Sequence, residues 1–111
     1  MTEPTEAEIE DRLDPRELPR LAEFLAAYLH EDLVPVHGTA QRAAFEFARD
    51  TDFEELVELA AEWQALRLAA VRLPLGRLNR LLRERFRCGW HVASSAEVEA
   101  VAHELERALA E

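Results

Sequence analysis

The 111-residue chain has no lysine and only one cysteine, and both shortages limit what it can do. A single thiol, Cys88, excludes an internal disulfide and cannot hold a zinc ion by itself. The three glycines form no glycine-rich phosphate loop, and no serine or cysteine stands beside a suitably placed histidine. The sequence therefore predicts neither a nucleotide site nor a catalytic centre. We expect a protein that is not an enzyme and needs no cofactor.

Long apolar runs are also missing. No stretch is long enough to cross a membrane, and no basic start leads into an apolar segment of the kind that secretory signals have. Apolar residues still make up 49% of the chain, which is enough for one packed core. We therefore expect a single cytoplasmic domain.

Charge of one sign dominates. The formal net charge is −10, which disfavours nucleic acid and anionic membranes as partners and favours a basic macromolecule. The charge is polarised, because residues 1–66 carry −12, residues 67–87 carry +6 and residues 88–111 carry −4. All 13 basic residues are arginine, a side chain suited to bidentate pairing with carboxylates. The simplest interpretation is that the basic segment folds against acidic ones.

The apolar spacing follows the helical period throughout, and only Trp90–Val92 is a candidate strand. We predict an all-α, compact single-domain bundle of about five helices over residues 15–111, preceded by a flexible acidic tail over residues 1–14. Helices are expected at about 19–31, 39–49, 75–85 and 94–109, and a further helix is expected to begin at 51 and to include residue 66.

Three helix starts carry capping signals. Thr39 is a good N-cap, and the spacings Thr51 to Glu54 and Ser94 to Glu97 are those of a capping box. On the helix that follows Thr51, the positions expected to face inward are Phe53, Leu56, Val57, Ala60, Trp63 and Leu66.

One carboxylate stands where an apolar side chain belongs. Asp32 follows Tyr28 by one turn, on the stripe that Leu18, Leu21, Phe24, Leu25 and Leu29 share. A charge on a core face needs a partner. Arg85 is similarly placed within the leucine arc of its own helix, so we favour a partly buried Asp32–Arg85 ion pair over a functional carboxylate.

The same region carries a family resemblance. The run Tyr28-Leu29-His30-Glu31-Asp32-Leu33 ends a leucine-rich helix. It is followed by Gly38-Thr39, an alanine-rich helix and an acidic helix. This order resembles the small all-helical immunity proteins of bacterial contact-dependent growth-inhibition systems, whose first helix ends in an aromatic-aromatic-His-Gln/Glu-Asp-aromatic run.

The resemblance implies neutralisation of a cognate toxin by direct contact. Many such toxins are nucleases with basic clefts, so an acidic inhibitor would fit. The residues expected to meet the toxin are Tyr28, His30, Glu31, Asp32, Glu54, Glu55, Glu58 and Glu62.

Other interpretations stay open. Arg77, Arg80, Arg83 and Arg87 share one helix face and would suit a nucleic-acid-binding or regulatory domain, although the net charge argues against it. The alternative is a solvated face. A helical assembly protein that associates through apolar surface is a third possibility. His30, Glu31, Asp32 and His37 lack the spacing that presents two imidazoles on one helix face, so we do not expect a metal site.

Overall fold

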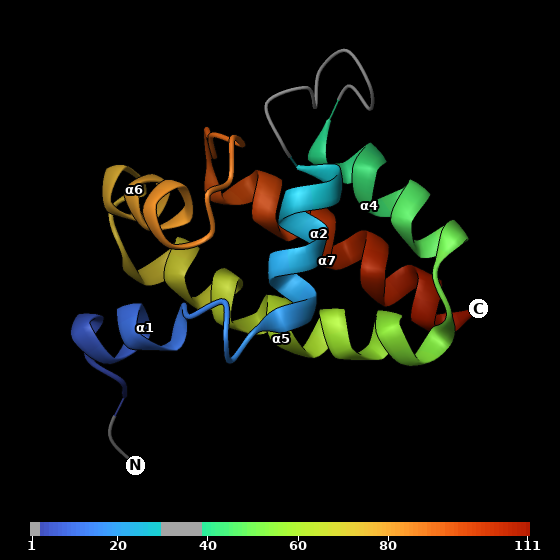
Figure 1. Ribbon diagram of the computed structural model, residues 1–111, viewed down its shortest axis with the longest axis horizontal. Helices are drawn as coiled ribbons and strands as arrows, with labels where there is room; N and C mark the ends of the chain where they lie inside the picture. The colour runs from blue at the N-terminus through green and yellow to red at the C-terminus, as the bar shows by residue number, and fades with distance from the viewer. Residues whose placement is uncertain (1–2, 30–38) are drawn as a thin grey trace.

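The described part of the chain consists of six helices and their connections, without a strand (Figure 1). The computed structural model describes residues 3–29 and 39–111. Its radius of gyration, 13.2 Å, is that of one compact domain of this length. The all-α, single-domain prediction is confirmed, with six helices rather than about five. They are α1 (Glu6–Arg12), α2 (Pro19–Tyr28), α4 (Ala40–Asp50), α5 (Phe53–Arg72), α6 (Leu75–Arg85) and α7 (Ser95–Ala110).

The longest helix, α5, is the one against which most of the other helices pack. It contacts α1, α2, α6 and α7, and α7 runs antiparallel beside it (Figure 1). Asp52 begins it by accepting a hydrogen bond from the Glu55 backbone N–H at 2.8 Å. The cap is thus one residue later than predicted, and Thr51 instead donates its hydroxyl to the Glu55 carboxylate at 2.6 Å. The helix continues past residue 66 until Pro74 prevents its extension.

The core is organised around Trp63. This side chain is fully buried, and its indole N–H donates to the Val98 carbonyl at 3.0 Å. The Phe24 ring meets it edge-on with centroids 5.7 Å apart, and the Trp90 ring stacks on it at 6.4 Å. One residue therefore joins α5 to α2, to α7 and to the loop that follows α6.

Two other predicted caps have different outcomes. Thr39 caps α4 as expected, because its hydroxyl accepts from the Arg42 N–H at 3.1 Å. Ser94 precedes α7, but its side chain makes no capping bond, so the predicted Ser94–Glu97 box does not form.

The loop after α6 is held by a buried amide rather than by strand pairing. Asn79 donates to the Val92 carbonyl at 3.0 Å and accepts from the Val92 N–H at 2.7 Å. Trp90 and Val92 are buried, so this segment belongs to the core without being a strand.

The stretch of residues 1–14, predicted as a flexible acidic tail, contains a docked helix in the structure. Residues 6–12 form α1, which Thr5 caps, and Ile9 and Leu13 are buried in the core. Arginines hold this segment in place: Arg77 pairs with Glu6 and Glu10 at 3.5 and 3.3 Å. Two apolar side chains four residues apart carry the packing, which is too short a pattern to stand out in an acidic stretch.

Replacing Ile9 tests whether α1 is docked in solution. Ile9→Ala should lower the free energy of unfolding by about 2–4 kcal/mol, because it removes a buried side chain from a packed site. Urea unfolding followed by tryptophan fluorescence measures this. The exposed neighbour Glu8 serves as control, since Glu8→Gln should change stability by less than about 0.5 kcal/mol. Equal behaviour of the two variants would contradict the docking of α1.

Candidate functional site

Four glutamates form the acidic face of α5, namely Glu54, Glu55, Glu58 and Glu62. Three of them make hydrogen bonds or ion pairs within the molecule. Arg20 of α2 lies against this face, with its Nε donating to Glu58 at 2.6 Å and an Nη 3.6 Å from Glu55. Hydrogen bonds to Glu58 and Glu23 raise the pKa of the Arg20 guanidinium, which stays charged. Two of the four glutamates predicted to meet a partner thus have an internal counter-ion.

Glu62 has a structural role. Its Oε1 accepts from the backbone N–H groups of Arg20 and Leu21 at 3.0 and 3.1 Å, at the start of α2. The N-cap residue of α2, Leu18, offers no side-chain acceptor, so this carboxylate on a neighbouring helix takes that part.

Glu54 remains available. It is exposed, and its side chain has no ion pair or hydrogen bond within the described residues. Beside it lie two large apolar side chains that the sequence placed in the core, Phe53 and Val57, which are 62% and 43% exposed. At about 100° per residue, Val57 lies about 120° round the helix from Trp63 and therefore faces solvent. We call Phe53, Val57 and the exposed Ala61 the apolar stripe.

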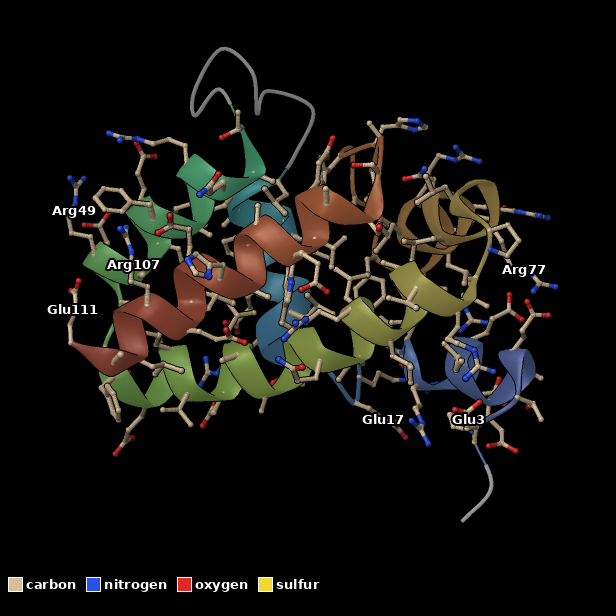
Figure 2. All side chains as sticks on the ribbon, turned by 180° about the vertical axis from the view of Figure 1, so that it is seen from behind. Glu3, Glu17, Arg49, Arg77, Arg107 and Glu111 are labelled. Atoms are coloured by element: carbon tan, nitrogen blue, oxygen red, sulfur yellow. The ribbon has the colours of Figure 1, made fainter. Side chains whose placement is uncertain are left out.

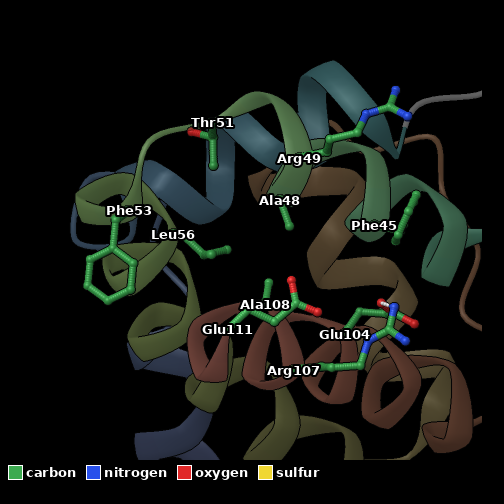
Figure 3. Close-up of a pocket in the computed structure, with 10 residues that line it drawn as sticks. All are labelled: Phe45, Ala48, Arg49, Thr51, Phe53, Leu56, Glu104, Arg107, Ala108 and Glu111. Carbon is green, nitrogen blue, oxygen red and sulfur yellow. Dashed lines mark hydrogen bonds and ion pairs between the residues drawn. The ribbon is translucent and has the colours of Figure 1, made fainter.

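A pocket of about 390 Å³ opens next to this stripe (Figure 3). It lies where the end of α4, the start of α5 and the end of α7 meet. Figure 3 shows Phe45 and Phe53 at its two ends, with Leu56, Ala48 and Ala108 between them. The remaining lining residues are Arg49, Thr51, Glu104, Arg107 and Glu111.

The buried carboxylate of this pocket has its hydrogen-bond partners within the protein. Glu104 is 9% exposed and accepts from Gln41 at 3.1 Å and from Arg107 at 2.9 Å. A second depression of about 340 Å³ continues along α4, where the Arg42 guanidinium lies 5.1 Å from the Phe45 ring centroid. Phe45, Glu104 and Arg107 line both, so the two form one groove between α4 and α7.

The arginine face of α6, formed by Arg77, Arg80, Arg83 and Arg87, contains both a paired arginine and arginines without a counter-ion in the described residues. Arg77 is neutralised by α1, whereas Arg80, Arg83 and Arg87 are exposed without a carboxylate partner in the described residues. Arg87 adopts the left-handed conformation, with φ of 52°, at the end of α6. Figure 2 shows Arg77 at the opposite end of the molecule from Arg49, Arg107 and Glu111.

The predicted cluster around Tyr28 is described only at its first residue. Tyr28 is half-buried and packs against the rings of Phe24 and Phe47, with centroids 5.6 and 5.4 Å away. His30, Glu31 and Asp32 lie outside the described residues, as does His37 of the metal-ligand set that we did not expect to form a site.

Arg85 is not placed as the sequence indicated. Its side chain is exposed and reaches over to α1, and so it does not lie within the buried arc of α6. Its guanidinium donates to the backbone carbonyls of Glu10 and Leu13, the second at 3.3 Å. It therefore caps the carboxyl end of α1, while the partner proposed for it, Asp32, lies outside the described residues.

Other site chemistry has little support in residues 3–29 and 39–111. No group of three or more His, Cys, Asp or Glu side chains there is placed to hold a metal ion. Burial raises the pKa of the Cys88 thiol, which contacts the Leu29 carbonyl at 3.1 Å. Such a thiol is a weak nucleophile at neutral pH. No helix among these residues is long and apolar enough to span a membrane.

Comparison with known proteins adds no relative. No family model, no curated protein and no solved structure matches this chain.

The division of the acidic face can be measured by substitution. Glu62→Ala should lower the free energy of unfolding by about 1–2 kcal/mol, because two backbone N–H groups of α2 lose their acceptor. Glu62→Gln keeps an acceptor oxygen and should retain most of that stability. Glu54→Ala should change stability by less than about 0.5 kcal/mol. If urea denaturation gave Glu54→Ala and Glu62→Ala the same loss, the capping role of Glu62 would be refuted.

Proposed function

We propose that this protein is an immunity protein that neutralises a cognate bacterial toxin by direct contact. The observation that carries the proposal is the exposed apolar stripe of α5, bordered by Glu54 and Glu58, on a protein of net charge −10. Aromatic anchors with a charged surround are typical of protein-binding surfaces. The family resemblance of the run that begins at Tyr28 points to the same function.

The charge indicates a basic toxin, such as a nuclease with a cationic cleft. Opposite charges on the two proteins would speed their encounter and favour the right partner. Neutralisation by covering the toxin's active site needs neither catalysis nor a cofactor. A toxin that acts on nucleic acid inside the cell would have to be met in the cytoplasm, which is where we place this protein.

Growth protection tests the function. A tagged form is used at moderate salt to recover partners from the native host, and mass spectrometry should identify the C-terminal domain of a large secreted protein. That domain, expressed alone in a test strain, should stop growth, and co-expression of this protein should restore it. A recovered domain that is toxic and not neutralised by this protein would disprove the proposal, whatever its binding affinity.

A second candidate function rests on the arginine face. Arg80, Arg83 and Arg87 are exposed without carboxylate partners in the described residues, and so offer three cations to phosphates. Retention on DNA or RNA at physiological salt, lost when Arg80 and Arg83 become glutamine, would support it. Arg49→Gln, at the other end of the molecule, is the control. We expect no such retention, because the surrounding net charge repels polyanions.

A further inference from the structure

We infer that the groove between α4 and α7, together with the apolar stripe of α5, docks a basic amphipathic segment of a protein. One large apolar side chain of that segment enters the pocket between Phe45 and Phe53. This inference rests on the proposed function and deepens it, because it states where the toxin binds and which chemistry it presents.

The pocket calls for an apolar occupant. In the described residues no buried side-chain nitrogen or oxygen lacks a hydrogen-bond partner, and the one buried carboxylate of the pocket, Glu104, already accepts from Gln41 and Arg107. A charged small ligand would have to compete for these bonds. The pocket surface that is free to contact a partner is apolar. It consists of Phe53, which is 62% exposed, and of the lining side chains Phe45, Ala48, Leu56 and Ala108. A volume of about 390 Å³ accommodates a large side chain.

The surroundings call for a basic occupant. The lining contains two guanidiniums, Arg49 and Arg107, and two carboxylates, Glu104 and Glu111. The charged chain neighbours of these lining residues are all acidic and bring the local formal balance to −6; they are Glu46, Asp50, Asp52, Glu54, Glu55 and Glu106. Arg42, which lines the continuation of the groove along α4, changes this balance only to −5. Of the two arginines that line the pocket, Arg107 is held by Glu104 at 2.9 Å and Arg49 lies 3.6 Å from Asp50. The carboxylates of the first turn of α5 outweigh the partial positive charge of its helix start.

The shape calls for a protein segment rather than an isolated side chain or a membrane. From Phe53, at the mouth of the pocket, the apolar stripe continues to Ala61, about 12 Å along the α5 axis. Glu54 and Glu58, each one residue after a residue of the stripe, lie along one side of it. Glu54 has no counter-ion in the described residues, whereas Glu58 is paired with Arg20. An amphipathic helix with an apolar face and basic flanks matches this track, as in other helix-in-groove complexes. An anionic membrane surface would be repelled by the same carboxylates.

A defined peptide probes the surface without the toxin. The probe is an amphipathic helical peptide of about 18 residues, built from leucine, alanine and lysine with a net charge of about +6. It is titrated into the isotopically labelled full chain and followed by two-dimensional NMR. We expect chemical-shift changes in residues 45–57 and 104–111. A peptide with the same charge but serine in place of leucine should bind at least tenfold more weakly.

Matched variants distinguish peptide binding at this surface from non-specific binding elsewhere on the protein. Phe53→Ser with Val57→Ser should weaken peptide binding by about tenfold or more. Val71→Ser is the control, because Val71 is 70% exposed on the same helix about 27 Å further along its axis. Ala108→Trp, which fills the pocket from α7, should also block binding. The NMR spectrum of each variant shows whether it is folded.

Three results of the peptide experiments would overturn the inference, and one result in cells would do the same. They are shifts centred on α6, equal binding of the serine peptide, and equal loss of binding in the Val71 variant. Growth protection that survives Phe53→Ser and Val57→Ser would show that the toxin binds elsewhere. If the peptide binds as expected while no toxin is neutralised, the docking surface stands and the proposed function fails.

Discussion

The burial of Trp63 is the constraint on which the rest of the structure depends. Its ring is fully enclosed between α2, α7 and the loop after α6, and its N–H is satisfied by the Val98 carbonyl. With Trp63 fixed, the rotation of α5 about its axis is fixed as well. Positions about 80–120° away from it, Phe53 and Val57, are then left in solvent. The same packing that builds the core thus exposes the surface we assign to a partner.

Arginine determines how the excess of negative charge is distributed. Arg20 forms ion pairs with Glu23, Glu55 and Glu58. Arg77 forms ion pairs with Glu6 and Glu10 of α1. Arg67 bridges α5 to Glu99 and Glu106 of α7 at 2.7 and 3.1 Å. Such exposed pairs contribute little stability individually. Their larger effect here is to leave a few carboxylates, Glu54 among them, without a counter-ion in the described residues.

Candidate site residues could be predicted only where the local pattern determines the surroundings. Glu54 was expected to be exposed, and it is. Glu62 follows the same acidic run, yet it caps α2, a helix some forty residues earlier in the chain. Nothing in the spacing of glutamates distinguishes the two. The exposure of Phe53 and Val57 had a usable signal, since both lie well off the arc that passes through Leu59, Trp63 and Leu66.

The sequence by itself determined the all-α class, the cap at Thr39 and the polarised charge, because each depends on residues a few positions apart. Tertiary structure decided the docking of α1, the capping of that helix by Arg85 and the groove between α4 and α7. Each of these brings together segments that are dozens of residues apart in the chain. Their contacts follow from how helices pack, which side-chain periodicity within one helix does not encode.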